Sequence, residues 1–148
     1  MVKLVILGEP MGKQRPKFSF KNGRAYTPQK TTSYENLVRH EYMAKYGKME
    51  FGENDCIQAI INAYFQTPKG DFGKKGLSKS GRAKEEQGWK CKTKADLDNI
   101  AKICLDSLNG VAFPDDRQVT SLFVHKYWSK QPRVEIILGI DLSKIEFE

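Results

Sequence analysis

The feature that most constrains the fold is an alternating pattern over residues 56–66, CIQAIINAYFQ. In a β-strand, successive side chains point to opposite faces of the sheet, so every second residue shares one face. Here one face is apolar along its whole length and consists of Ile57, Ala59, Ile61, Ala63 and Phe65. Thr67 and Pro68 end the run. The pattern predicts a strand with one face buried in a core.

The opening of the chain predicts a strand followed by a helix. Residues 2–9 alternate and are rich in β-branched residues, which predicts a first strand that ends at Gly8. Thr32 and Glu35 have the spacing of a capping box, in which two side chains pair with free backbone N–H groups at a helix start. Apolar residues at intervals of three and four then continue to Gly47, which predicts a helix of about four turns.

The second half of the chain predicts another helix and two strands. The helix ends at Asn109-Gly110, because these residue types tolerate the left-handed conformation at a helix end. Its shared face consists of Ile100, Ile103, Cys104, Ser107 and Leu108. The segments at 118–128 and 133–140 predict strands, and the short link SKQP between them predicts an antiparallel hairpin. The whole order indicates an α+β domain, in which a small mixed β-sheet packs against two α-helices.

Length and composition limit the classes of protein to which this chain can belong. The 148 residues suit a single domain over residues 1–148 and leave no room for a second. No apolar run reaches the roughly 18 to 20 residues of a membrane helix, and the apolar start is too short for a secretory signal. Cys56, Cys91 and Cys104 are widely spaced without a C-x-x-C pair, which predicts free thiols. We therefore expect a soluble cytoplasmic protein with no membrane partner.

The net charge of +7 is concentrated in two stretches. Residues 10–30 contain six basic residues and no acid, and residues 69–94 contain nine basic residues and three acids. Both stretches contain Gly and Pro and lack apolar periodicity, which predicts long surface loops or arms. Clustered Lys and Arg bind phosphates with release of counterions, so the pattern indicates a polyanion partner. The alternative is that both loops are merely solvated.

Four acidic residues flank the second predicted helix. Asp96 and Asp98 precede it, two residues apart, so in extended backbone their side chains point the same way. Asp115 and Asp116 follow the helix in the segment FPDDRQ. If the chain returns toward the sheet after the helix, three carboxylates converge. Either pair alone is a weak signal, and their position around one helix, directly after a basic loop, strengthens it.

Converging carboxylates repel one another unless a hard cation neutralises them. Oxygen ligands suit Mg²⁺ or Mn²⁺ rather than zinc. His40 and His125 are too few and too scattered for a histidine-based site. A metal held by carboxylates between phosphate-binding loops can polarise a phosphoryl oxygen, activate a bound water and stabilise the leaving 3′ oxygen. The acids therefore predict phosphodiester hydrolysis.

Structural roles for the same residues stay open. Asp98 is well placed as a helix N-cap with Asp96 as a solvated neighbour, and Asp115 and Asp116 could form an ordinary turn. Lys102 follows Asp98 by one helical turn. It either stabilises negative charge on a phosphate or forms an i,i+4 salt bridge worth about a few tenths of a kcal/mol.

Taken in order, these segments resemble the RusA family of Holliday-junction resolvases, which are phage- and prophage-associated endodeoxyribonucleases. A G-x-P-x-x-K-x-R-P-like segment lies at residues 8–16, and a K-x-D-L-D-N-x-x-K block lies at 94–102. An L-D-x-L-N-G block follows at 105–110 and a D-D-x-Q-V block at 115–119. The similarity covers most of the chain, and the series at this spacing is specific.

The resemblance implies a RusA-like fold and a homodimer that binds four-way DNA junctions in recombination and repair. It also implies two symmetric nicks made with Mg²⁺ or Mn²⁺, and no small-molecule cofactor. By position, Asp96, Asp98 and Asp116 match the family's metal-binding acids, and Lys102 matches its essential lysine. The pattern leaves the role of Asp115 open, and the insertion at residues 72–88 has no match.

The approximate two-fold symmetry of a four-way junction suits an isologous dimer with two identical sites. The apolar face of the first helix and the opening strand are candidate interfaces. The residues predicted to contact phosphates are Lys13, Arg15, Lys17, Arg24, Lys74, Lys75, Lys79 and Arg82.

A competing interpretation is a non-catalytic basic DNA-binding accessory module, in which the acids only cap the helix and orient lysines. Aromatic residues lie within the basic stretches and could stack on splayed bases or anchor the loops to the core. They are Phe18, Phe20, Phe72 and Trp89.

Overall fold

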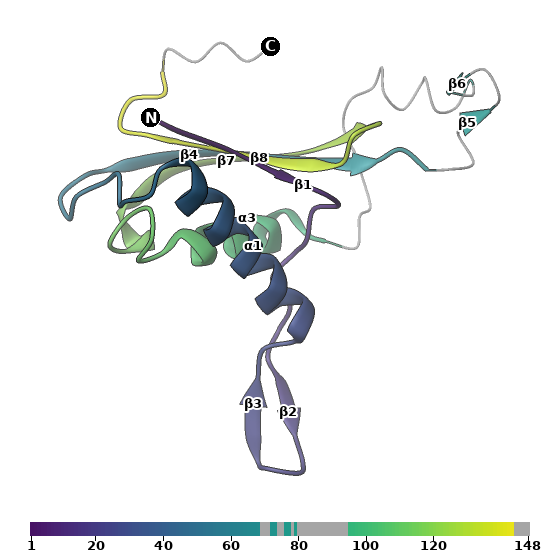
Figure 1. Ribbon diagram of the computed structural model, residues 1–148, viewed down its shortest axis with the longest axis horizontal. Helices are drawn as coiled ribbons and strands as arrows, with labels where there is room; N and C mark the ends of the chain where they lie inside the picture. The colour runs from purple at the N-terminus through teal and green to yellow at the C-terminus, as the bar shows by residue number, and fades with distance from the viewer. Residues whose placement is uncertain (69–71, 74–75, 78, 80–94, 144–148) are drawn as a thin grey trace.

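In the computed structural model, which describes residues 1–68, 72–73, 76–77, 79 and 95–143, a four-stranded mixed sheet carries two α-helices on one face (Figure 1). The strand order is β1 (Val2–Leu7), β8 (Arg133–Gly139), β4 (Ile57–Gln66) and β7 (Val119–Ser129). The helices are α1 (Gln29–Lys45) and α3 (Leu97–Leu108). The predicted α+β fold is confirmed.

Smaller elements complete the described part of the chain. β2 (Lys17–Ser19) and β3 (Arg24–Tyr26) form an antiparallel hairpin that projects away from the sheet (Figure 1). β5 (Phe72–Gly73) pairs with β6 (Gly76–Leu77), and the short 3-10 helix η2 (Asp116–Gln118) precedes β7. The first basic stretch, predicted as a loop, therefore contains a hairpin. No described helix is long and apolar enough to cross a membrane.

Strand β4 lies in the interior of the sheet, and its core-facing side is apolar along its whole length, with the predicted period of two. The opposite face is half-buried and mostly polar, with Ile60 as its one buried residue. An interior strand has neighbours on both edges, which satisfy its backbone groups. Its neighbours are β8, which runs antiparallel, and β7, which runs parallel.

The predicted hairpin between the last two strands is wrong. β7 and β8 form, but β4 lies between them, so Tyr64 of β4 pairs with Tyr127 on one side and with Arg133 on the other. The short link spans the end of β4, where the Thr67 N–H donates to the Ser129 carbonyl at 2.9 Å. Because β4 and β7 are parallel, a crossover must connect them, and α3 belongs to that connection.

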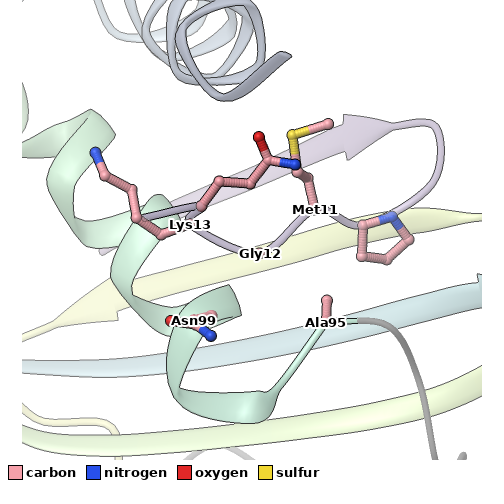
Figure 2. Close-up of a pocket in the computed structure, with 7 residues that line it drawn as sticks. Met11, Gly12, Lys13, Ala95 and Asn99 are labelled. Atoms are coloured by element: carbon pink, nitrogen blue, oxygen red, sulfur yellow. The ribbon is translucent and has the colours of Figure 1, made fainter. Parts of the chain in front are cut away.

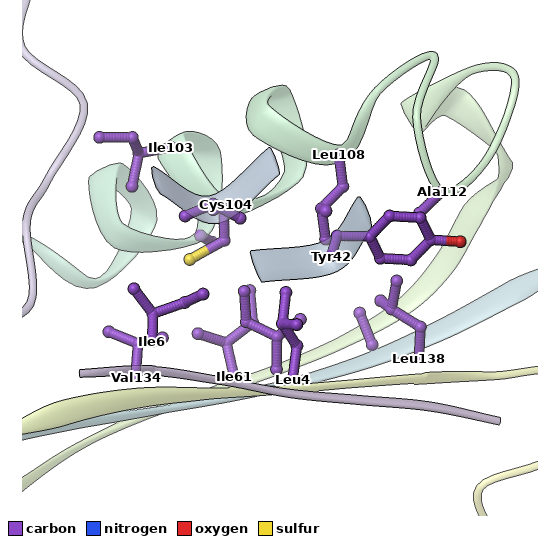
Figure 3. Close-up of a cluster of buried hydrophobic side chains, with 14 of the residues drawn as sticks. Leu4, Ile6, Tyr42, Ile61, Ile103, Cys104, Leu108, Ala112, Val134 and Leu138 are labelled. Carbon is purple, nitrogen blue, oxygen red and sulfur yellow. The ribbon is translucent and has the colours of Figure 1, made fainter. Parts of the chain in front are cut away.

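Side chains from the sheet and from both helices form one core (Figure 3). Val2, Leu4 and Ile6 point inward from β1, and Ile103, Cys104 and Leu108 face them from α3. Cys56 and Cys104 are free thiols, as predicted, and Cys91 lies outside the described residues. Burial raises the pKa of the Cys104 thiol to about 12, so this thiol is inert as a nucleophile at neutral pH.

Helix α1 begins four residues earlier than the capping-box pattern predicts. Pro28 is its N-cap residue, and no side chain caps it. The Thr32 hydroxyl donates to the Pro28 carbonyl at 3.4 Å, and Glu35 is bound by Lys13 instead of by the helix start. The capping box is therefore wrong, because Glu35 has a stronger, cationic partner in the folded chain.

Two buried tyrosines of α1 differ in their hydroxyl groups. The Tyr42 hydroxyl donates to the Lys48 carbonyl at 2.7 Å, whereas the Tyr34 hydroxyl is buried with no hydrogen-bond partner in the described residues. We predict that Tyr42→Phe lowers the free energy of unfolding by about 1 kcal/mol, and that Tyr34→Phe leaves it unchanged or higher. Urea unfolding of both variants tests this, and an equal loss in the two would contradict it.

Candidate active site along helix α3

The start of α3 presents two carboxylates to solvent. Asp96 is the N-cap residue with extended backbone, but its side chain makes no capping hydrogen bond. Asp98 lies in the first turn, so the alternative that Asp98 caps the helix is wrong. Both side chains are exposed. Negative charge at this end is favoured by the partial positive charge of the helix N-terminus.

Asp98 borders a hollow between α3 and the edge strand β7. Leu97 and Ala101 line it from the helix, and the strand contributes residues 122–125. One turn further along α3, Lys102 is exposed. None of the ion pairs between described residues joins Lys102 to Asp98, so the alternative role of Lys102 in an i,i+4 salt bridge is wrong.

The segment after α3 separates the roles of its two acids. The Asp115 carboxylate accepts from the Arg117 N–H at 2.9 Å and forms a capping box with Gln118. Arg117 also pairs with Asp115 through its guanidinium at 2.9 Å. These bonds hold the pKa of the exposed Asp115 carboxyl below its ordinary value. Asp115 is thus a structural cap, while Asp116 takes no part in that cap.

Asp116 lies in the opposite electrostatic environment. Its pKa is raised, first by desolvation, then by its hydrogen bond with Asp115 and by the negative charge of Asp106. Asp106 belongs to the C-terminal half of α3, eight residues after Asp98. At a rise of about 1.5 Å per residue, that separates the two by about 12 Å along the helix. Asp116 is therefore coupled to the far end of α3 from Asp96 and Asp98.

The predicted convergence of Asp96, Asp98 and Asp116 is not seen within this chain. Among the described residues, no three acidic, histidine or cysteine side chains are grouped closely enough to hold a metal ion. Asp96 and Asp98 lie at the N-terminal end of α3, whereas Asp116 is in the field of Asp106 in the C-terminal half. Their donor chemistry still suits a hard cation, since all three are carboxylates.

The first basic stretch is attached to α3 directly beside these acids. A Cβ on Gly12 would lie 3.2 Å from the Cβ atoms of Ala95 and Asn99, so only glycine allows this close approach without a shift (Figure 2). The Lys13 N–H donates to the Asn99 carbonyl at 2.9 Å. A cavity of about 220 Å³ remains between the two segments.

Lys13 has a different position from the other predicted phosphate contacts. Its ammonium lies 2.8 Å from Glu35 and 3.3 Å from Asp106, and Arg39 supports Glu35 at 3.3 Å. Burial opposes the charge of Lys13, but the two carboxylates outweigh it and raise its pKa. Lys13 therefore joins the first basic stretch, whose residues 10–28 precede α1 and are called the arm below, to both helices. Sequence reasoning missed Glu35 and Asp106 as its partners, because no local pattern pairs them.

The remaining predicted contacts are solvent-exposed or outside the described residues. Arg15, Lys17, Arg24 and Lys79 are exposed. Lys74, Lys75 and Arg82 lie outside the described residues.

The model of the endodeoxyribonuclease RusA family matches residues 8–139. The chain belongs to this family. A relative of similar length, the uncharacterized protein YqaN of Bacillus subtilis strain 168, is 31% identical over 140 residues, which cover 93% of this chain and 94% of that protein. Membership of this family indicates that the protein is an endodeoxyribonuclease, which hydrolyses DNA. The matched range contains the arm, α3 and all four candidate catalytic residues.

The raised pKa of Asp116 has a consequence for stability. The ordinary pKa of an aspartate is 3.8, and the pKa of Asp116 in the folded state is higher. The free energy of unfolding therefore falls as the pH rises through these values, because the unfolded state releases the proton more readily. We predict that Asp116→Asn raises the Tm at pH 7 by about 1–2 °C, and that the difference shrinks toward pH 4. Asp115→Asn is the matched control and should lower the Tm at pH 7, because the pKa of Asp115 is depressed. A lower Tm for Asp116→Asn at pH 7 would contradict the assignment.

Proposed function

We propose that this RusA-family protein is a structure-selective endonuclease that resolves four-way DNA junctions by paired phosphodiester hydrolysis in recombination and repair. The observation that carries the proposal is the family match over residues 8–139, a range that contains Asp96, Asp98, Lys102 and Asp116. The exposure of Asp98 and Lys102 supports it, because neither side chain serves in a cap or in an ion pair between described residues.

Mg²⁺ is the metal we propose, with Mn²⁺ able to substitute. Asp96, Asp98 and Asp116 would hold it, because carboxylate oxygens are the ligands that both ions prefer. The described chain does not hold the three acids together beforehand. When bound, such an ion supplies Lewis acidity and an activated water.

The protein's own groups have distinct tasks in this proposal. Lys102 stands one turn beyond Asp98 on the solvent side of α3, where its ammonium can stabilise negative charge on the attacked phosphate. Arg15, Lys17, Arg24 and Lys79 are exposed cations that can bind the phosphates of the duplex arms. We propose the same contacts for Lys74, Lys75 and Arg82. Lys13 contributes to the arm's attachment instead.

A homodimer is part of the proposal, because two symmetric cuts need two sites related by a two-fold axis. Of the two candidate interfaces, the apolar face of α1 is occupied, since Tyr34, Val38 and Tyr42 are buried in the core. The opening strand keeps apolar side chains on its outer face, where Val5 and Leu7 are exposed. That face is the better candidate.

The first test is the variant Asp98→Asn. We expect it to bind four-way junctions as the wild type does and to lose cleavage in Mg²⁺ by at least about 100-fold, since it removes a proposed ligand charge. Gel assays on four-way junctions and linear duplexes measure cleavage, and Mn²⁺ electron paramagnetic resonance measures metal binding without activity. Glu50→Gln, which changes an exposed acid distant in sequence from α3, is the control and should cut normally.

The non-catalytic DNA-binding module remains the second candidate, favoured by the lack of a grouped set of acids among the described residues. Wild-type protein that binds junctions but never cuts them in Mg²⁺ or Mn²⁺ would establish it and end the nuclease proposal.

The second test is Lys102→Ala. We expect cleavage to slow by about 100-fold or more, because an ammonium beside the transition state is removed. The Tm should stay within about 1 °C of the wild type, because the exposed side chain carries little stability. A large fall in Tm with normal activity per folded molecule would assign Lys102 to structure instead.

A further inference from the structure

The hairpin of β2 and β3 presents aromatic rings to solvent at its outer end. Phe20 is 95% exposed and Phe18 is 56% exposed, and their rings meet edge to face with centroids 5.3 Å apart. Phe18 pairs across the hairpin with Ala25, which leaves its ring uncovered by any large neighbour on the partner strand. Large rings exposed in this way commonly mark a binding surface.

The hairpin tip has a defined conformation. The Gly23 N–H donates to the Ser19 carbonyl at 2.9 Å, and Gly23 has a φ of +66°, which glycine adopts without strain. The Arg24 N–H donates to the Asn22 side chain at 3.2 Å. Phe20 lies between Ser19 and Gly23, so its backbone is held by this turn. A ring that is ordered before binding costs less entropy when it engages a partner.

The basic residues near the rings indicate a polyanionic partner, and the exposed rings indicate a partner with planar groups that can stack on them. Lys17, Lys21 and Arg24 are close to the two phenylalanines in the hairpin sequence, and no acid lies between Glu9 and Glu35. Aromatic rings flanked by cations are the combination that binds unpaired nucleic acid, where bases stack on the rings and phosphates contact the cations. Bases inside a duplex are already stacked, whereas bases at a branch point can be splayed out.

The segment that leads into the hairpin is attached to α3. Gly12 lies against Ala95 and Asn99 at the start of this helix (Figure 2), and Lys13 bridges Glu35 and Asp106. The hairpin therefore leaves the domain from a point beside Asp96 and Asp98. We propose that Phe20, supported by Phe18, stacks on an unpaired base at the branch point of a DNA junction and thereby selects branched over linear DNA. This inference rests on the proposed function, because it names the feature of the substrate that the arm recognises.

The test compares the full-length wild type with Phe20→Ala and with the double variant Phe18→Ala/Phe20→Ala. Fluorescence anisotropy in EDTA gives the Kd for a four-way junction and for a linear duplex of the same sequence without cleavage. We expect Phe20→Ala to weaken junction binding about tenfold and duplex binding less than twofold. Phe20→Trp should restore junction binding. Met43→Ala removes an exposed apolar side chain on α1 and should change neither Kd.

A spectroscopic signal separates stacking from general affinity. A junction with 2-aminopurine beside the branch point should change in fluorescence when the wild type binds, and Phe20→Ala should abolish the change. The same probe placed inside a duplex arm should not respond to either protein.

Failure of the inference differs from failure of the proposed function. If the wild type cuts junctions and the double variant binds them with unchanged affinity, the stacking role of the arm is overturned while the nuclease proposal stands. If binding depends on Phe20 but no metal ion supports cleavage, the nuclease proposal fails and the stacking role stands. Equal wild-type affinity for junction and duplex would overturn the role of the arm in selection.

Discussion

The interior position of β4 in the sheet is the constraint on which the rest of this molecule depends. Its core-facing side chains are buried along the whole strand, and both of its edges are paired with neighbouring strands. β8 and β7 supply those neighbours, and the parallel pairing of β4 with β7 requires a crossover. α3 lies in that crossover. The helix with the candidate catalytic residues therefore packs where it does because of the strand beneath it.

The acids of the candidate site lie at different points along α3 and in the segment after it, and no three of them form a group among the described residues. Its N-terminal end presents Asp96 and Asp98, and its C-terminal half brings Asp106 beside Lys13 and into the field of Asp116. Two acids have structural roles: Asp115 caps η2, and Asp106 binds Lys13 of the arm. The side chains of Asp96 and Asp98 have no such role among the described residues, which leaves them available for the chemistry proposed above.

The arm and the candidate site are both attached to helix α3. Gly12 allows the backbone to approach α3 closely, and Lys13 neutralises Glu35 and Asp106 in the space between the two helices. Glu35 is almost entirely buried, so it requires a cation within hydrogen-bond distance. The arm's orientation therefore depends on the same electrostatic pairing that stabilises the contact between α1 and α3. The exposed rings at its far end are positioned by residues that do not themselves touch a substrate.

The sequence by itself determined the elements that depend on local patterns. The period of two along β4, the apolar face of α3 and its end at Asn109-Gly110 are all local properties, and the structure confirms them. The order of chemical blocks likewise identified the family without coordinates. Tertiary structure alone decided which strands pair, because β4 lies between β7 and β8 although those two strands are adjacent in the chain. It alone decided that Lys13 binds Glu35 and Asp106, and that Asp116 lies in the field of Asp106, because charges distant in the chain become partners only when the core brings their elements together.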